Sequence, residues 1–132
     1  MKLTDKRFWI AWVVLLTVIC VSCNDEIHIA GSYYCYQNNT LICAIHNTHS
    51  DMDVPPTVLE YKTDGTYITV KQKPRLPQDA IYKTIAYPDY NPKSLYYWII
   101  EVHSDYIIGP LTYSSFLIEC ENRNIGYKMQ FQ

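Results

Sequence analysis

Four side chains of types that bind transition metals lie close together in one short stretch of the sequence. His46, His49, Asp51 and Asp53 form an H-x-x-H-x-D-x-D pattern, and imidazole and carboxylate groups are ligands of zinc and copper. A histidine pair three residues apart suits a helix, however, and this stretch leads from a predicted strand towards Pro55-Pro56. The sequence therefore favours a solvated polar loop over a metal site, and we predict no bound metal or other cofactor.

Three cysteines, Cys35, Cys43 and Cys120, follow the N-terminal segment. Cys35 and Cys43 lie on the two arms of a predicted hairpin. With a three-residue loop they stand directly opposite each other and can form a disulfide, whereas a two-residue loop turns Cys43 to the other side of the sheet. The sequence leaves both loops open, and a bridge from Cys120 to either cysteine is a further alternative. Unpaired, Cys120 is expected to be a buried, inert thiol.

A cysteine nucleophile at Cys43, with His46 or His103 as its base, is the one arrangement that suggests catalysis. No family-specific active-site signature surrounds it. The sequence also lacks a G-x-S-x-G motif, a glycine-rich phosphate loop and a paired-carboxylate motif, and its four glycines leave little room for such loops. We therefore predict that the protein is not an enzyme.

The N-terminal residues have the features of an export signal. Lys2, Lys6 and Arg7 form a positive head, and residues 8–24 carry no charge. This apolar run is shorter than the roughly 20 residues that span a bilayer comfortably. It fits the apolar region and small-residue cleavage site of a signal peptide. We predict a signal peptide over residues 1–22, with an uncleaved signal anchor as the alternative.

The end of this run, Cys20-Val21-Ser22-Cys23, resembles the lipobox of bacterial lipoproteins. Ser22 and Cys23 match the motif, whereas Cys20 occupies the position that is usually Leu. The resemblance implies that Cys23 carries lipid and becomes the N-terminus; cleavage by the ordinary signal peptidase is the alternative. Several acyl chains hold a protein stably on a bilayer. We therefore expect a bacterial cell-envelope protein that is anchored in a membrane and faces the periplasm or the cell exterior.

The mature part of the chain, from Asn24 onwards, is acidic. It has 8 Lys and Arg and 12 Asp and Glu, so its net charge is 8 − 12 = −4. Nucleic-acid binding depends on neutralising phosphates with cations, and we predict no nucleic-acid partner. All 13 tyrosines lie in this part, where most are expected to pack across strands.

Turn residues divide the mature part into short elements. We expect a tether over residues 23–30 and one β-rich domain over residues 31–132. Strands over 32–36 and 41–46 form a first hairpin. Asp64-Gly65 forms the turn of a second hairpin, in which a two-residue loop pairs Thr63 with Thr66, Tyr61 with Ile68 and Leu59 with Val70.

Residues 74–94 contain Pro74, Pro77, Pro88 and Pro92, so we expect a long loop with a short strand around residues 81–87. Tyrosine and arginine are enriched at binding surfaces. We therefore predict that this loop is used in recognition of a partner, and the alternative is a plain connection whose tyrosines lie on the sheet. The candidate recognition residues are Arg75, Tyr82, Tyr87 and Tyr90.

The C-terminal third contains the predicted core. Residues 95–102 are apolar on both faces, which suits a central strand. A short partner strand covers residues 106–108, Gly109-Pro110 ends the sheet, and Thr112 caps a helix over residues 113–122. A last strand is expected over residues 127–131. The predicted fold class is α+β, with a mainly antiparallel sheet of about five or six strands and one C-terminal helix.

Several short motifs follow one another in a characteristic order. They are Pro55-Pro56-x-Val58, Asp64-Gly65-x-Tyr67-Ile68-x-Val70-Lys71-Gln72, Tyr97-Trp98-Ile99-Ile100-Glu101, Gly109-Pro110-Leu111 and Phe116. This order resembles a family of small bacterial lipoproteins that carry a domain of unknown function. The similarity covers roughly residues 31–125, and the family has no established activity, so the resemblance implies no catalytic residues.

Together these features predict a non-catalytic envelope lipoprotein that binds or supports a molecule, such as a protein partner, at the membrane. A first alternative is an immunity or inhibitor protein that blocks a toxin or hydrolase, because a small, acidic, tyrosine-rich anchored domain suits that role. A second alternative is a metal-binding or thiol-active protein that uses Cys43, His46 and His49.

Overall fold

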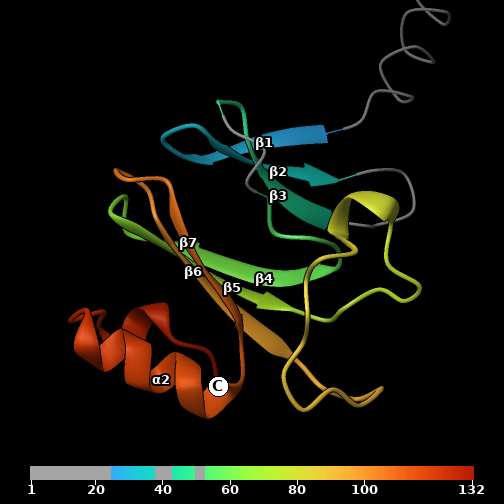
Figure 1. Ribbon diagram of the computed structural model, residues 1–132. Coiled ribbons are helices and arrows are strands. Elements are labelled where there is room, and N and C mark those ends of the chain that lie inside the picture. The colour runs from blue at the N-terminus through green and yellow to red at the C-terminus, as the bar shows by residue number, and fades with distance from the viewer. Residues whose placement is uncertain (1–24, 38–42, 50–52) are drawn as a thin grey trace, which may run out of the picture.

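A computed structural model describes residues 25–37, 43–49 and 53–132, and strands dominate these residues (Figure 1). They form seven strands, one α-helix and two short 3-10 helices. The α+β class with mainly antiparallel sheet is confirmed, although the described strands form two sheets. The elements are β1 (Asp25–Ala30), β2 (Tyr33–Gln37), β3 (Cys43–Asn47), β4 (Val58–Thr63), β5 (Tyr67–Gln72), η1 (Ala80–Tyr82), β6 (Tyr96–Glu101), β7 (Tyr106–Leu111), α2 (Tyr113–Asn122) and η2 (Tyr127–Met129).

Sheet A contains β1, β2 and β3 in that order, all antiparallel. The predicted first hairpin is β2–β3, but neither predicted register is correct. Cys35 pairs with Ile45 and Gln37 pairs with Cys43, so the connection is five residues long, 38–42. In place of the expected tether, residues 25–30 form β1. This strand occupies an edge of β2 that would otherwise be unpaired.

Sheet B contains β4, β5, β6 and β7 in that order, and its first hairpin turns at the predicted Asp64-Gly65. The predicted register is wrong by two residues, because Thr63 pairs with Ile68. The Asp64 carboxylate explains the longer loop. It accepts hydrogen bonds from the backbone N–H groups of Thr66 and Tyr67 at 2.9 and 2.8 Å, as aspartate often does in turns.

A bulge in β4 decides which side chains of that strand reach the core. A register shift of two residues leaves every side chain on its predicted face, but the irregularity between Val58 and Glu60 reverses the faces of the first residues of β4. Val58 is therefore buried, whereas Leu59, which the sequence placed on the apolar face, is 50% exposed.

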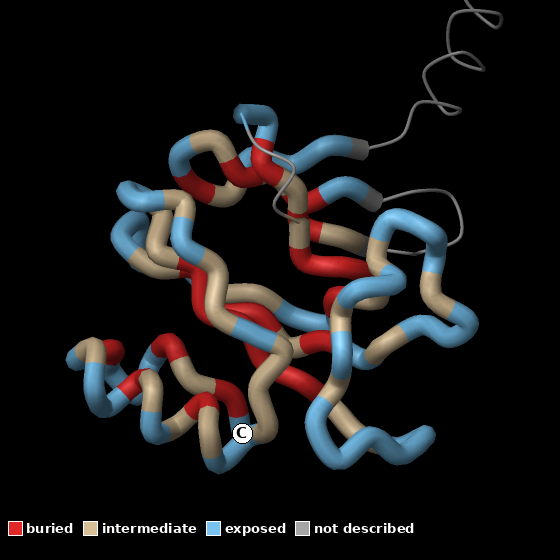
Figure 2. Tube along the Cα trace, in the orientation of Figure 1, coloured by how far each residue is buried: buried red, intermediate tan, exposed pale blue. Residues whose placement is uncertain are grey.

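Strand β6 is the centre of the molecule, as its apolar sequence predicted. Five of its six residues are buried. On one face of sheet B, Trp98 and Ile100 pack with residues of sheet A such as Tyr33 and Ile45. On the other face, Tyr97 and its neighbours pack against α2 and the C-terminal tail. Sheet A, sheet B and α2 therefore form three layers, with buried residues through the middle (Figures 1 and 2).

Strand β7 continues through Gly109-Pro110, where the sequence predicted that the sheet would stop. Between the Ile99–Ile108 and Tyr97–Leu111 pairs, β7 contains one residue more than β6, which is a bulge. Since β7 is an edge strand, the missing N–H of Pro110 is tolerated there. Gly109 is required because a Cβ atom at this position would lie 2.5 Å from the Trp98 ring.

Helix α2 begins and ends as predicted, and the Thr112 side chain accepts a hydrogen bond from the Ser115 N–H. The predicted last strand, by contrast, is wrong: the tail forms η2. Side chains of sheet B and α2 donate hydrogen bonds to carbonyl groups of the tail and hold the tail against sheet B. Thr69 donates to the Met129 carbonyl at 2.6 Å, Lys62 to the Gln130 carbonyl at 2.7 Å and Tyr113 to the Phe131 carbonyl at 2.6 Å. Within the described ranges, no helix is long and apolar enough to cross a membrane.

Candidate functional site

A cleft of about 850 Å³ opens between the two sheets and the segment that joins β5 to β6. We call that segment, residues 73–95, the proline loop, and the cavity the inter-sheet cleft. Sheet B contributes one wall, the proline loop a second, and β3 with the residues after it a third. The lining residues are Trp98, Ile107, Gly109 and Pro110 from sheet B, Ile81, Tyr82, Thr84, Ile85 and Ala86 from the loop, and His46, Asn47 and Asp53.

The fully buried Gln72 side chain fixes two of these walls. Its Oε1 atom accepts a hydrogen bond of 2.6 Å from Trp98 Nε1. Its Nε2 atom donates to the Pro55 carbonyl at 3.0 Å and to the Tyr87 hydroxyl at 2.9 Å. The Trp98 indole in the cleft wall and the proline loop are therefore both hydrogen-bonded to one side chain. Side chains alternate between the two faces along β5, so Gln72 lies on the same face as Ile68 and Val70.

The proline loop contains η1 but no strand, so the predicted strand around residues 81–87 is wrong. The second half of the loop, before β6, packs instead against the core and sheet B. Ile85 contacts the core between the sheets, the Gln78 side chain donates to the Ile85 carbonyl at 3.3 Å, and the Tyr96 hydroxyl donates to the Pro88 carbonyl at 2.7 Å. These contacts give the loop a fixed shape although it lacks regular structure.

The four predicted recognition residues have different environments. The Tyr87 ring lies 4.8 Å from the Tyr96 ring, and burial raises the pKa of its hydroxyl, opposed by the hydrogen bond from Gln72. Tyr90 packs against Tyr87 at 6.5 Å and is 43% exposed. Tyr87 therefore holds the loop in place, while Tyr90 remains accessible at the surface.

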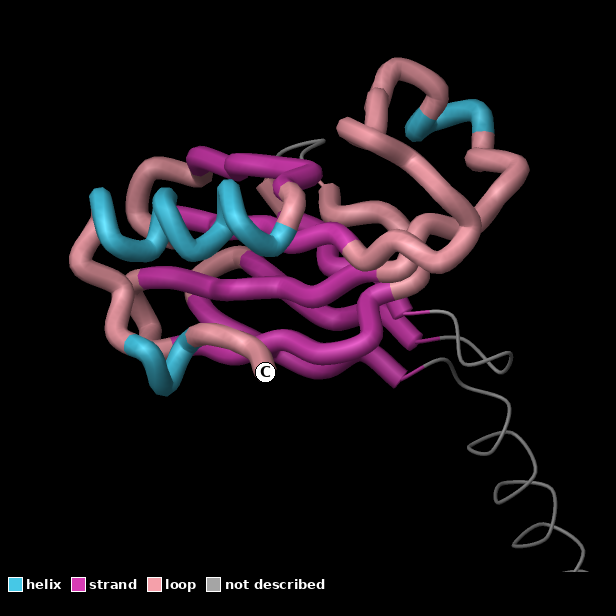
Figure 3. The backbone as a smooth tube through the Cα atoms, turned by 90° about the horizontal axis from the view of Figure 1, so that it is seen from below, coloured by secondary structure: helices cyan, strands magenta, loops and turns pink. Residues whose placement is uncertain are grey.

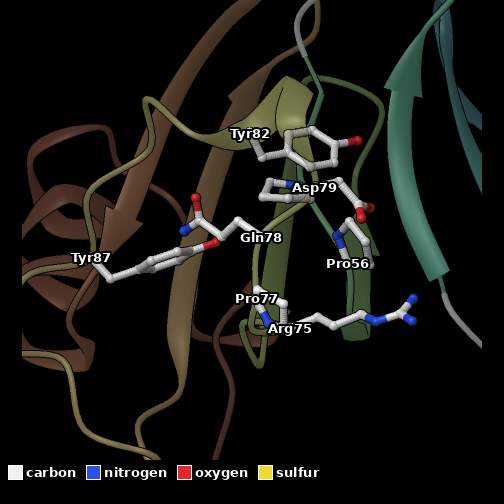
Figure 4. Close-up of a pocket in the computed structure, with 8 residues that line it drawn as sticks. Pro56, Arg75, Pro77, Gln78, Asp79, Tyr82 and Tyr87 are labelled. Atoms are coloured by element: carbon white, nitrogen blue, oxygen red, sulfur yellow. The ribbon is translucent and has the colours of Figure 1, made fainter.

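Arg75, Tyr82 and Tyr87 also line a second, much smaller hollow of about 10 Å³, beside Pro56 and Asp79. That volume holds about one water molecule. Figure 4 shows the Arg75 side chain leading away from Tyr87, with its guanidinium group at the far side. This hollow is too small for a ligand, so Arg75 is an exposed cation on the loop surface and does not belong to a binding pocket.

Tyr82 combines with Asp53 to form the polar part of the inter-sheet cleft. Burial raises the pKa of the Tyr82 hydroxyl to about 12, and the negative charges of Asp53 and then Asp79 add to the effect. The hydroxyl therefore stays protonated across the physiological pH range and can donate a hydrogen bond. The sequence analysis named both residues but assigned them to separate sites.

The histidines of the proposed metal pattern do not converge. His46 Nε2 lies 2.9 Å from a Glu26 carboxylate oxygen, and its ring neighbours the rings of Tyr34 and Tyr36 at 6.1 and 6.3 Å. The backbone N–H of His49 donates to the Asn47 side-chain oxygen at 2.8 Å. Asp51 lies outside the described residues, among which no three metal-binding side chains are grouped.

Two cysteines have a defined state. Cys35 is disulfide-bonded, while Cys120 is a free thiol in the core. Burial, with a smaller contribution from the neighbouring charge of Glu119, raises the pKa of the Cys120 thiol to about 11, so it is not a nucleophile at neutral pH. The predicted lipid site Cys23 and the side chain of Cys43 lie outside the described residues, and the Cys35–Cys43 bridge stays a prediction.

Contacts between sheet A and the β6–β7 hairpin fix the width of the cleft. The Asn47 side chain donates to the Asp105 carboxylate at 2.9 Å. Gly31, in the β1–β2 turn, has a φ of +55°, and a Cβ atom there would lie 2.6 Å from Val102. The sequence analysis assigned no role to Asn47, Asp105 or Gln72; a polar Gln72 on an otherwise apolar strand face was the one signal that could have drawn attention.

The fold and the cleft define a small α+β protein in which two antiparallel sheets and the proline loop surround a ligand-sized cavity. The chain belongs to the family described as "Protein of unknown function (DUF3997)", which matches residues 30–132. This match confirms the predicted resemblance to a domain of unknown function. No curated protein and no solved structure matches the chain.

Proposed function

We propose that this chain is a lipid-anchored binding protein of the bacterial cell envelope that takes a neutral or positively charged ligand into the inter-sheet cleft. The cleft carries this proposal. Its volume of about 850 Å³ lies within the roughly 300–1,000 Å³ typical of ligand pockets. Such sites combine apolar and aromatic walls with a few polar groups, as do Trp98, Ile107 and Tyr82 here.

The charged groups of the cleft support a neutral or cationic ligand. Asp53 supplies a carboxylate, and no Lys or Arg is found among the described lining residues. An anionic ligand would therefore meet the like charge of Asp53 in the cleft wall, which disfavours its binding. Asn47 and the protonated Tyr82 hydroxyl offer hydrogen bonds to the ligand's polar groups.

The proposal of a lipid anchor is based on the signal sequence and Cys23. Intact-mass analysis of the protein extracted from bacterial membranes tests this proposal. We expect a chain that begins at Cys23 and carries acyl groups, and we expect Cys23→Ala to leave the lipoprotein pathway. An unmodified N-terminus at Cys23 or Asn24 would contradict the anchor.

The cleft can be tested through Trp98, the only tryptophan of the mature chain. Fractions of an envelope extract are titrated into the protein while the Trp98 emission is followed. Ala86→Phe places a ring in the cleft and should abolish the response, whereas Ser114→Phe on the exposed surface of α2 should keep it. A response that is equal in both variants would exclude the cleft as the binding site.

A second candidate, an inhibitor of another protein, is supported by the outer face of sheet A. His28, Tyr34, His46 and Tyr36 form a continuous row of rings there, with neighbouring centroids 5.0 to 6.3 Å apart. Tyrosines are frequent in protein interfaces. Tyr34→Ala would then remove a co-purifying protein, while Ala86→Phe would leave it bound.

A further inference from the structure

The proline loop differs in charge from the rest of the mature chain. Residues 73–95 contain four cations and two acids, 4 − 2 = +2, while the other mature residues contain four cations and ten acids, 4 − 10 = −6. All four cations are exposed, and none forms an ion pair with another described residue. The cations are Lys73, Arg75, Lys83 and Lys93.

Two large aliphatic side chains stand among these cations and point into solvent. Leu76, next to Arg75, is 49% exposed, and Ile81, two residues before Lys83, is 76% exposed. The loop that carries them is held by Gln72, Tyr87 and Tyr96. Little further conformational entropy is therefore lost when these side chains bind a surface. Aliphatic side chains flanked by cations are typical of surfaces that rest on membranes.

The position of the anchor places the proline loop beside a bilayer; this step rests on the proposed function. Asp25, the first residue of β1, follows Cys23 by two residues, which an extended chain spans in about 7 Å. The start of β1 is therefore held close to the membrane. In Figures 1 and 3, which view the molecule at 90° to each other, the proline loop and the start of β1 lie towards the right and α2 towards the left, and in Figure 3 the loop is on the upper side and the start of β1 on the lower side.

We infer that the proline loop is a membrane-contact surface, in which Leu76 and Ile81 enter the interface of an anionic bilayer. Lys73, Arg75, Lys83 and Lys93 then lie near the lipid phosphates. The acidic remainder of the domain is repelled by the same surface, so the charge segregation orients the molecule as well as attracting it. Each cation near an anionic bilayer is worth roughly a five-fold change in the equilibrium between docked and undocked loop.

The test uses the full chain purified from bacterial membranes and reconstituted into vesicles. Ile81→Trp reports on the loop, and Ile118→Trp, which is 58% exposed on α2, is the matched control. The wild-type emission is subtracted from both. With phosphatidylglycerol in the vesicles, brominated lipids should quench the new indole of Ile81→Trp and not that of Ile118→Trp. Pure phosphatidylcholine or high salt should weaken the quenching.

A second comparison isolates the charges. Adding Arg75→Gln and Lys83→Gln to the Ile81→Trp chain should shift docking by roughly 25-fold, while adding Lys128→Gln, an exposed cation outside the loop, should change nothing. Equal quenching in all vesicles and variants would overturn the inference. So would an Ile81→Trp indole that the lipids do not quench and that a co-purifying soluble protein covers instead. Intact-mass analysis of the same sample reports on Cys23. The mass shows whether Cys23 is lipid-modified, and the quenching shows whether the proline loop contacts the bilayer. The quenching can be measured even if the lipid anchor is absent, because a retained signal segment would still hold the chain in the vesicles.

Discussion

Gln72 forms three hydrogen bonds, with Trp98 of β6, the Pro55 carbonyl and Tyr87 of the proline loop. Gln72→Leu keeps the side-chain volume similar but leaves the Trp98 N–H and the Pro55 carbonyl without their partner. Each buried polar group left unsatisfied costs about 1–3 kcal/mol. We therefore expect Gln72→Leu to lower the free energy of unfolding by about 2–5 kcal/mol, measured by urea denaturation.

A matched substitution separates this network from a general effect of leucine. Gln132→Leu changes the same residue type at the exposed C-terminus, and its midpoint of unfolding should equal that of the wild type. A Gln72→Leu protein as stable as the Gln132→Leu protein would show that the network contributes nothing to stability.

Cys120 gives a prediction on pH. Its thiol is fully buried, and its pKa is raised to about 11 in the folded protein. Well below pH 9, the ordinary pKa of a thiol, Cys120 is protonated in both states. Between about pH 9 and 11 the unfolded chain loses this proton while the folded protein keeps it, so the stability falls as pH rises, by at most about 1.4 kcal/mol per pH unit.

The Cys120→Ala variant removes this titration and is the control, because every tyrosine and lysine remains. Its stability should fall less steeply than that of the wild type above pH 9, measured by urea denaturation at a series of pH values. Parallel pH profiles of the two proteins would show that the thiol ionises equally in the folded and unfolded states.

At the scale of elements, β7 depends on Gly109. Its φ of +152° and the 2.5 Å approach of the Trp98 ring leave no room for a Cβ atom. Strain and overpacking each cost about 1–3 kcal/mol, so Gly109→Ala should destabilise the protein by about 2–5 kcal/mol in thermal or urea denaturation. Gly126→Ala, where nothing lies within 4 Å, should have little effect, and equal stabilities of the two variants would refute this role for Gly109.

The proline loop gives a second prediction at this scale. Tyr87 accepts a hydrogen bond from Gln72 and packs on Tyr96, whereas Tyr90 is 43% exposed. Tyr87→Ala should therefore lower the melting temperature by several degrees, and Tyr90→Ala should lower it much less. If Tyr90→Ala were the more damaging substitution, the loop would be held differently from the arrangement described above.

Elements whose signals are local could be predicted from the sequence, and those set by distant contacts could not. The two-faced apolar run of β6 and the Thr112 cap of α2 identified both elements. The β4–β5 register was missed because one side chain, Asp64, rebuilds the turn. The last strand was wrong because Lys62 and Thr69, from far along the chain, bind the tail's carbonyl groups.

The candidate site was predicted only in part. Arg75, Tyr82, Tyr87 and Tyr90 do lie on one exposed loop, but their separate environments depend on how that loop packs on sheet B. The inter-sheet cleft could not be predicted, since it exists only where β3, β7 and the proline loop meet. The surroundings of the histidine pattern could not be predicted either, because sequence spacing does not show that His46 faces Glu26 across sheet A.

At the scale of the whole molecule, the two sheets share one core along Trp98 and Ile100, and the cleft lies between sheet B, β3 and the proline loop. Trp98 belongs both to the core and to the cleft wall. A ligand in the cleft therefore contacts the central strand of the fold, and its binding should raise the stability of the folded protein as well as alter the Trp98 emission.

Native mass spectrometry of the protein extracted from its own membranes tests the central claim, a ligand held in the cleft of an anchored protein, most directly. The account predicts a lipid-modified chain that carries an additional non-covalent mass. This mass should be absent from Ala86→Phe and retained by Ser114→Phe. A chain without bound mass, or a bound mass that is retained equally by Ala86→Phe, would contradict the account.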